Sequence, residues 1–330
     1  MDGAIVVRAN GGSEVLEWTQ SDPGQPGPGE VLIRHTAGGL NYIDVYQREG
    51  LYPLELPFTP GMEGAGRVEA VGEDVADLSP GDAVAYTGNG PAGSYREGRV
   101  LPRSRLVPLP DGIDEQTAAA IMLKGCTVEY LVRRTFPVHE GHVVLLHAAA
   151  GGVGLLASQW LKALGATVIG TVGSDEKAEL ARAHGCDHPI VYTRENVVER
   201  VKALTDGAGV PVVFDSVGRD TFMASLDCLQ PRGLMVSYGN ASGAVEPFSP
   251  GVLAAKGQLF LTRPTLATYI GTREELDAAT TELFDVVQSG AVKVEVSQVF
   301  ALKDAAQAHR DLEARKTTGS TVLMMEGEES

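Results

Sequence analysis

A run of small residues at positions 148–154, Ala-Ala-Ala-Gly-Gly-Val-Gly, is the stretch of this chain that points most directly to chemistry. An apolar segment, 142–146, precedes it, and a segment with apolar residues at steps of three and four follows it. Such a turn lets a pyrophosphate reach backbone N–H groups at a helix start, where the helix dipole is positive. The spacing Ala149-x-Gly151-x-x-Gly154 is a dinucleotide fingerprint with alanine in its first position. We therefore predict a pyrophosphate site at Ala150, Gly151, Gly152 and Val153; the alternative is a tight turn without a ligand.

The end of the next predicted strand, 166–172, indicates which dinucleotide binds. NAD sites usually place Asp or Glu there, where the carboxylate holds the ribose hydroxyls. This chain has Gly173 and Ser174 instead, so no carboxylate at the strand tip would repel a 2′-phosphate. Ser174 can donate a hydrogen bond and Lys177 can supply a positive charge, which favours NADPH over NADH. Ser174 is equally suited to cap the helix that follows, and the two roles are compatible.

Composition restricts the class of partner. The chain has 330 residues, enough for about two domains, and a formal net charge of −16, which argues against nucleic acid and anionic membrane. Its three cysteines, Cys126, Cys186 and Cys228, are far apart, so they indicate neither a disulfide framework nor a cysteine metal cluster. The N-terminus lacks the pattern of a signal peptide, and the longest apolar run is short and broken by glycine. We expect a cytoplasmic protein whose partner is a small molecule.

Two regions of different pattern follow each other along the chain. Up to about residue 124, short strand candidates alternate with glycine-rich turns, as in a β-rich domain. Residues 117–133 read as a helix with a break at Gly125. From residue 141 strands and helices alternate, which predicts a doubly wound parallel sheet of five strands with a sixth candidate at 258–262. The fold class is α/β.

Several motifs together resemble one family. They are Asn41-Tyr-Ile-Asp, Gly50-Leu-Tyr-Pro, Glu63-Gly-Ala-Gly, Leu123-Lys-Gly-Cys-Thr-Val-Glu-Tyr, the fingerprint turn, Phe-Asp-Ser-Val-Gly from Phe214, and Gly239-Asn-Ala-Ser-Gly. This set resembles the quinone oxidoreductase family of the medium-chain dehydrogenase/reductases, which includes zeta-crystallin and bacterial NADPH:quinone reductases. The resemblance implies a GroES-like catalytic domain at 1–124 and 267–330 and a Rossmann NADPH-binding domain at 125–266. It also implies a cleft between them and a homodimer, for which we expect the edge strand near 258–262 to be the contact.

The same resemblance argues against zinc. Zinc alcohol dehydrogenases of this superfamily carry Gly-His-Glu where this chain has Gly61, Met62 and Glu63, and a thioether is a poor zinc ligand. Residues 86–110 contain no cysteine for a structural zinc site. Without a Lewis acid we expect no oxidation of simple alcohols, and instead reduction of an acceptor that is already electrophilic.

The resemblance places several donors around the nicotinamide. The predicted catalytic residues are Asn41, Tyr46, Tyr52 and Arg263, with Asn240 on the same wall as Arg263; amide, phenol and guanidinium groups can all donate to a quinone oxygen. Tyr52 can also hand over a proton, although bulk water could do this. The alternative for Tyr46 and Tyr52 is aromatic packing beside an apolar slot.

The remaining residues of the predicted cofactor site follow from the same resemblance. Tyr130 matches a ribose-contacting tyrosine and Tyr192 flanks the adenine or the 2′-phosphate; their alternatives are packing and a surface position. Asp215 ends a strand, and we expect it to be a cap, with Ser216 and Val217 nearer the cofactor. Arg315 and Lys316 can reach the 2′-phosphate or simply suit a helix C-terminus; of these we include Arg315. Thr127, Tyr238, Gly239 and Ala241 complete the set.

The predicted function is zinc-independent, NADPH-dependent quinone reduction. A close alternative is reduction of α,β-unsaturated carbonyls, which needs the same cofactor geometry and a proton donor at the far carbon. A different class is a non-catalytic NADPH-binding protein, crystallin-like or RNA-binding. The negative charge argues against RNA, and the full set of site residues argues against a purely structural role.

Overall fold

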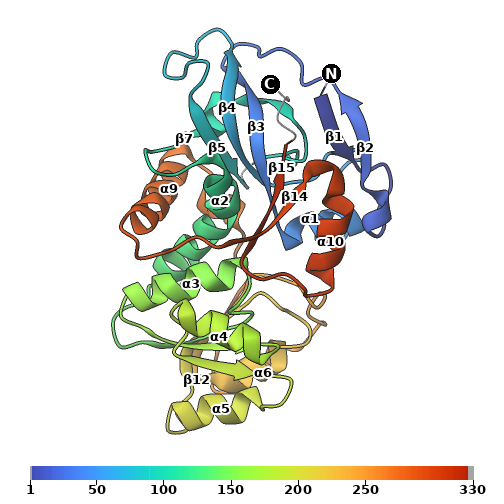
Figure 1. Cartoon of the computed structure of the whole chain (residues 1–330). Helices are drawn as coiled ribbons and strands as arrows, with labels where there is room; N and C mark the ends of the chain where they lie inside the picture. The colour runs from blue at the N-terminus through green and yellow to red at the C-terminus, as the bar shows by residue number, and fades with distance from the viewer. Residues whose placement is uncertain (1, 89, 326–330) are drawn as a thin grey trace. The chain divides into compact units, whose positions relative to one another are not determined.

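The computed structural model describes residues 2–88 and 90–325 and divides the chain into two compact units (Figure 1). Unit 1 contains the described residues up to Cys126, Tyr269–Gln288, and the described residues from Val294 onward. Unit 2 contains Thr127–Thr268 and Ser289–Lys293. The chain therefore leaves the first unit, builds the second, and returns.

Unit 2 is built on a six-stranded parallel sheet. Its strands are β8 (Val143–Leu146), β9 (Thr167–Val172), β10 (His188–Val191), β11 (Val210–Asp215), β12 (Leu229–Ser237) and β13 (Phe260–Thr262). The order across the sheet is β10-β9-β8-β11-β12-β13, so the chain winds in one direction from β8 and in the other from β11. The parallel sheet and its sixth strand are as predicted, and the order reverses beside β8, where such sheets bind ligands.

Helices connect these strands, and one more, α8, follows the last of them. They are α3 (Gly152–Ala163), α4 (Asp175–Ala183), α5 (Val197–Leu204), α6 (Phe222–Cys228), α7 (Gly251–Ala255) and α8 (Leu266–Tyr269). Helix α3 ends before Gly165, which has φ +81°, and the Asn196 side chain caps α5 by accepting hydrogen bonds from the Val198 and Glu199 N–H groups. Val144, Leu145 and Leu146 of β8 are fully buried, as expected for a strand covered on both faces.

Unit 1 contains a mostly antiparallel sheet and a separate hairpin. The hairpin pairs β1 (Asp2–Val6) with β2 (Glu17–Ser21). The sheet runs in the order β14 (Val296–Ala301), β15 (Ser320–Met324), β3 (Glu30–Leu40), β4 (Glu63–Val71), β5 (Ala83–Thr87) and β7 (Val107–Pro108), and β6 (Gly98–Pro102) also pairs with β3. Strands from the two ends of the sequence thus share one sheet, because β15 pairs antiparallel with β3.

The helices of unit 1 correct one prediction. They are α1 (Tyr42–Glu49), α2 (Glu115–Glu129), α9 (Arg273–Gln288) and α10 (Ala305–Glu313). The last residues of α2, from Thr127, already belong to unit 2, as does the π-helical segment Tyr130–Thr135 that follows. The predicted break at Gly125 is wrong, since α2 continues through it. A Cβ atom at Gly125 would lie 2.3 Å from Leu283 Cδ1, so the glycine permits close packing against α9 and does not interrupt the helix.

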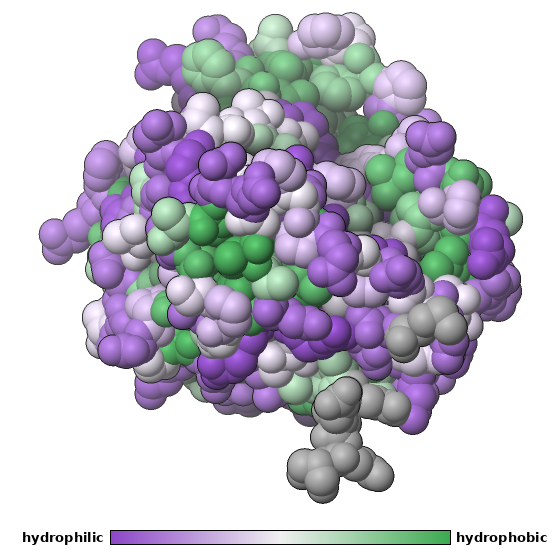
Figure 2. All heavy atoms as spheres, turned by 90° about the horizontal axis from the view of Figure 1, so that it is seen from above, coloured by the Kyte–Doolittle hydropathy of each residue, from purple (hydrophilic) through white to green (hydrophobic). Residues whose placement is uncertain are grey.

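The surface is mixed in character. The face in Figure 2 is largely hydrophilic, with apolar side chains in several separate areas. In the part of the chain that the structure describes, no helix has both the length and the apolar character needed to cross a bilayer.

Candidate active site

The predicted cofactor residues of unit 2 gather at one edge of its sheet. Because all six strands are parallel, their carboxyl ends meet at that edge, and the predicted residues follow the strands directly. Residues 150–153 follow β8, Gly173 and Ser174 follow β9, Tyr192 follows β10, Ser216 and Val217 follow β11, residues 238–241 follow β12, and Arg263 follows β13. Lys177 lies in the first turn of α4. Thr127 and Tyr130, which are buried, lie instead at the end of α2 and in the π-helical segment.

The turn after β8 has the geometry that its composition predicts. Ala148 has φ +56°, and the Gly151 N–H donates to the Ala148 carbonyl at 2.9 Å. Helix α3 begins after Gly151, a residue with no side chain to cap it. A Cβ atom on Gly154 would lie 2.2 Å from the Ala148 carbonyl oxygen, so this position requires glycine. The start of α3 is thus open to an anion, the role expected of this turn.

The tip of β9 is also as predicted in its local structure. Ser174 is the N-cap of α4, and its hydroxyl oxygen accepts a hydrogen bond from the Lys177 N–H at 3.3 Å. The Tyr192 ring lies against Gly173, because a Cβ atom there would come within 2.9 Å of the phenol oxygen. Tyr192 is 44% exposed, so this ring is available to a ligand. The capping role of Ser174 is confirmed, and its role toward the cofactor stays a prediction.

A buried polar network that was not predicted from the sequence joins the strand ends. His147, which follows β8, lies 2.9 Å through Nδ1 from the Thr171 hydroxyl of β9. Its Nε2 lies 2.9 Å from the Ser225 hydroxyl, which donates to Asp215 Oδ2 at 2.8 Å. The other Asp215 oxygen accepts from the Val217 and Gly218 N–H groups at 2.8 and 3.1 Å. Asp215 is therefore a cap that shapes the loop after β11, as expected, and it does so from a fully buried position.

The donor in this network fixes one hydrogen of His147. The Ser225 proton goes to the Asp215 carboxylate, so the serine oxygen accepts the hydrogen of His147 Nε2. Burial lowers the pKa of His147 and favours the neutral ring, in which Nδ1 accepts from the Thr171 hydroxyl. The only sequence cue was its place, directly before the small-residue turn.

The loops after β11 and β12 are joined to each other by backbone contacts. The Tyr238 N–H donates to the Asp215 carbonyl at 2.8 Å, and the Ala241 N–H to the Ser216 carbonyl at 3.2 Å. A Cβ atom on Gly239 would lie 2.4 Å from the Ser216 carbonyl oxygen. Glycine at this position is therefore required for the approach of the two predicted cofactor loops.

In unit 1, the Asn41 side chain contacts a buried ion pair between Glu63 and Lys124. Its side chain donates to Glu63 Oε1 at 2.7 Å, and the Lys124 ammonium donates to the same oxygen at 2.6 Å. The second Glu63 oxygen accepts from the Leu123 N–H at 2.6 Å. Glu63 is fully buried, and its charge is compensated by Lys124. Lys124 was a motif residue without an assigned role; in the structure it supports the side chain that orients Asn41.

The two predicted catalytic tyrosines of unit 1 are neighbours. The rings of Tyr46 and Tyr52 have centroids 5.2 Å apart at an interplanar angle of 68°, and the Tyr52 N–H donates to the Tyr46 carbonyl at 3.1 Å. Tyr46 is buried, at 7% exposure, whereas Tyr52 is half-buried. The buried position of Tyr46 is therefore explained largely by aromatic packing. Tyr52 packs against the same ring and is also accessible to solvent.

Met62 occupies the place where zinc alcohol dehydrogenases have a histidine. Its sulfur accepts a hydrogen bond from the Gln47 amide at 3.4 Å, and its neighbour Glu63 is held by Lys124. Among residues 2–88 and 90–325, no three His, Cys, Asp or Glu side chains are grouped as metal ligands.

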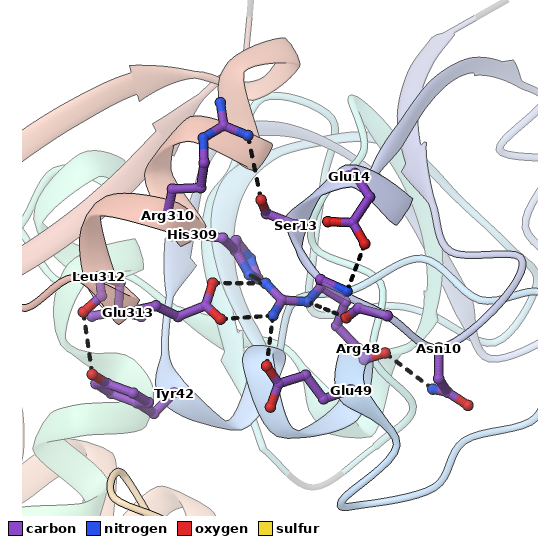
Figure 3. Close-up of polar contacts among 12 residues, drawn as sticks. Asn10, Ser13, Glu14, Tyr42, Arg48, Glu49, His309, Arg310, Leu312 and Glu313 are labelled. Carbon is purple, nitrogen blue, oxygen red and sulfur yellow. Dashed lines mark hydrogen bonds and ion pairs between the residues drawn. The ribbon is translucent and has the colours of Figure 1, made fainter.

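A second buried network holds α1, the helix that begins after Asn41, to α10 (Figure 3). Arg48 has a fully buried side chain and donates to both Glu313 carboxylate oxygens at 2.8 and 3.0 Å, and to His309 Nδ1 at 3.1 Å. His309 Nε2 lies 3.1 Å from the Tyr95 hydroxyl, which donates to Asp44 Oδ2 at 3.0 Å. The same carboxyl oxygen accepts from the Asn41 N–H at 2.9 Å. Burial raises the pKa of Asp44 to about 7 and lowers that of His309 to about 3.

Comparison with known proteins agrees with this architecture. Residues 27–111 match the family model of the alcohol dehydrogenase GroES-like domain, and residues 152–285 match the model described as zinc-binding dehydrogenase. A quinone oxidoreductase of Pseudomonas aeruginosa is 56% identical over 321 residues, which are 97% of this chain and 98% of that protein. The chain belongs to the quinone oxidoreductase family of the medium-chain dehydrogenase/reductases.

Two further relatives show which activities this family includes. The crystal structure of Escherichia coli quinone oxidoreductase complexed with NADPH has 47% identity and a TM-score of 0.95, covering 98% of this chain and 99% of that chain. A 2-haloacrylate reductase of a Burkholderia species is 43% identical, over 97% of this chain and 98% of that protein. One family thus contains reductases named for quinones and for an activated alkene.

Proposed function

We propose that this protein is an NADPH-dependent quinone reductase. The observation that carries the proposal is the edge of the parallel sheet, where a turn suited to a pyrophosphate lies next to a strand tip that ends in Gly173 and Ser174. Its similarity along nearly the whole length to quinone oxidoreductases, one of them solved with NADPH, supports both the cofactor and the acceptor.

When bound, NADPH supplies the hydride, and the protein holds and orients it. The N–H groups at the start of α3 bind the pyrophosphate, and the loops after β11 and β12 carry the segments Ser216–Val217 and 238–241 toward it. Ser174, Lys177 and Tyr192 bind the 2′-phosphate end, while Thr127, Tyr130 and Arg315 complete the proposed set. The His147–Asp215 network keeps these loops in place before the cofactor arrives.

Negative charge develops on the acceptor oxygen as the hydride is transferred, and this chain offers neutral and cationic donors for it. We assign that role to Tyr52 and Asn41, with Tyr46 beside them and with Arg263 and Asn240 from unit 2. Tyr52 is the best candidate to deliver a proton, because it is half-buried and next to a second phenol. Since Met62 replaces the histidine ligand, we propose that the reaction proceeds without zinc.

An acceptor panel tests this proposal. We would follow NADPH oxidation with 1,4-benzoquinone, 1,2-naphthoquinone and a series of α,β-unsaturated carbonyls and haloacrylates. Fast turnover with quinones supports quinone reduction. Turnover confined to the alkenes favours the second candidate, activated-alkene reduction. The observation that supports this candidate is the 43% identity to a 2-haloacrylate reductase. Tight NADPH binding without turnover indicates the non-catalytic alternative, and an RNA gel shift at physiological salt then tests its RNA-binding form.

We propose in addition that two copies associate through β13. This strand lies at the edge of the sheet, and Phe260 and Leu261 on it are 61% and 37% exposed. An edge strand with exposed apolar side chains is a natural site for pairing with a second chain. A cytoplasmic location is also proposed, since Cys126, Cys186 and Cys228 are all buried and none of the three is in a disulfide.

A further inference from the structure

An exposed ion pair lies directly beside the proposed 2′-phosphate end of the site. Two guanidinium nitrogens of Arg194 donate to the two carboxylate oxygens of Asp175, at 2.8 and 2.5 Å. Asp175 is the first residue of α4, next to Ser174, and Arg194 follows β10 by three positions. The bidentate pair therefore links the tips of two neighbouring strands, β9 and β10.

The surroundings hold Arg194 near the tip of β9. The Tyr192 ring lies against Gly173, and the Thr193 hydroxyl donates to the Gly173 carbonyl at 3.4 Å. The Arg194 N–H donates to the Val191 carbonyl at 3.0 Å, so the turn after β10 is fixed by its own backbone. In dinucleotide-binding sheets the adenosine ribose lies at the tip of the second strand, which here is β9.

The strand tip itself has no carboxylate, but Asp175 and Glu176 in the first turn of α4 would repel a phosphate there if they were not paired. The Arg194 guanidinium holds the pKa of Asp175 below its usual range, and a hydrogen bond from Ser174 does the same for Glu176. The Arg194 guanidinium and the Ser174 hydroxyl can donate to a phosphate as well as to a carboxylate. Arginine in particular binds phosphate in a bidentate manner. In the protein without NADPH, the acids therefore hold the donors that a 2′-phosphate needs.

We propose that Arg194 is a specificity-determining residue that binds the 2′-phosphate of NADPH, with Asp175 holding its guanidinium at the strand tip. This inference rests on the proposed use of NADPH and adds a residue that the sequence motifs did not include. NADH lacks the 2′-phosphate and gains nothing from Arg194.

The test is the dissociation constant of each nucleotide, measured by quenching of protein fluorescence in the absence of any acceptor. We expect Arg194→Gln to weaken NADPH binding roughly tenfold and to change NADH binding less than about twofold. The loss should shrink as salt rises, since the arginine is exposed. The matched control is Arg182→Gln, because Arg182 lies in α4, the helix that Asp175 begins, is 50% exposed and pairs with Glu179. Equal NADPH affinity in the two variants overturns the proposal, and so does a parallel loss of NADPH and NADH.

A double variant distinguishes contact with phosphate from mere neutralisation of Asp175. If Arg194 only compensates the aspartate, Asp175→Asn combined with Arg194→Gln restores NADPH affinity, which contradicts the proposal. If Arg194 binds the phosphate, the double variant stays as weak as Arg194→Gln. Arg194→Lys keeps the charge without the bidentate geometry. Its NADPH affinity should therefore lie between that of the unchanged protein and that of Arg194→Gln.

These outcomes are separate from those of the acceptor panel. Selective loss of NADPH affinity in Arg194→Gln supports this inference even if quinones are not reduced. Quinone turnover with unchanged NADPH affinity in Arg194→Gln supports the proposed function and removes Arg194 from the site.

Discussion

Individual residues carry the proposed chemistry, and Tyr52 gives the clearest test of it. If its hydroxyl donates to the acceptor, Tyr52→Phe should lower kcat for quinone reduction about tenfold, with the dissociation constant of NADPH unchanged. Steady-state kinetics and nucleotide titration measure the two quantities.

Tyr42→Phe is the control for that experiment. The Tyr42 hydroxyl donates to the Leu312 carbonyl at 3.2 Å, so its loss removes a structural contact of α1, the helix that precedes Tyr52. Should Tyr52→Phe retain the full kcat, the phenol serves only for packing against Tyr46.

Asp215 should matter for both stability and cofactor binding. Asp215→Ala leaves the Val217 and Gly218 N–H groups and the Ser225 hydroxyl without their shared acceptor, at a cost of about 3 kcal/mol in the free energy of unfolding. NADPH affinity should fall as well, because the loop after β11 loses its shape. Urea unfolding and NADPH titration check both effects.

An exposed aspartate provides the comparison for Asp215. Asp220 is 54% exposed and pairs with Arg219, so Asp220→Ala should change stability by less than about 0.5 kcal/mol. Similar effects of the two substitutions would mean that the buried network does not hold the loop.

Among the elements, α2 tests why a glycine stands inside a helix. Alanine normally stabilises a helix interior relative to glycine, but a Cβ atom at Gly125 would lie 2.3 Å from Leu283 Cδ1, and Leu283 is fully buried. We expect Gly125→Ala to lower the free energy of unfolding by about 2 kcal/mol through overpacking.

A double-variant cycle isolates that contact. In a Leu283→Ala background, Gly125→Ala should be neutral or stabilising, as judged by chemical unfolding. If Gly125→Ala already stabilises the otherwise unchanged protein, α9 yields to the methyl group and the packing argument is wrong.

The link between α1 and α10 predicts a dependence of stability on pH. Burial and the nearby Arg48 charge lower the pKa of His309 to about 3, whereas an unfolded histidine titrates near about 6.5. As the pH falls below that value, the unfolded chain binds a proton that the folded chain does not, so folding stability is lost. Between pH 7 and 5 this loss amounts to about 2 kcal/mol.

His309→Asn removes that titration. The variant should be less stable at pH 7, but its stability should fall less on acidification, by about 2 kcal/mol, than that of the unchanged protein. Asp44, whose pKa is raised to about 7, titrates in both proteins and opposes the trend in both. Parallel pH profiles from denaturant unfolding would show that His309 is not held neutral.

Some elements of this fold were predictable from the sequence and others were not. The turn at 148–154 and the parallel sheet were predictable because small residues and apolar periodicity are local signals. The prediction of a helix break at Gly125 was wrong. Glycine stands there because the Leu283 side chain, far along the chain, packs against it. Three other features were not predictable for the same reason, because each depends on partners that only the folded chain brings together. They are the His147–Asp215 network, the role of Lys124 and the Asp175–Arg194 pair.

At the scale of the whole molecule, the exposed edge strand predicts a dimer. Sedimentation of the unchanged protein should give twice the chain mass, and Phe260→Glu should shift it to one chain mass by placing a charge on the edge of β13. Met223→Glu is a suitable control, because Met223 is another exposed apolar residue, on α6, and should leave the dimer intact. A single chain mass for the unchanged protein would remove the proposal.

We propose that a strand tip without a carboxylate, surrounded by donors, selects NADPH for the reduction of a quinone. The most direct test is the ratio of kcat/KM for NADPH to that for NADH, with one saturating quinone. We expect a preference for NADPH of about tenfold or more, because in the proposed site the 2′-phosphate is bound by Ser174, Lys177 and Arg194, which pairs with Asp175. Equal efficiency with NADH, or a preference for it, would contradict the assignment of this edge of the sheet as an NADPH site.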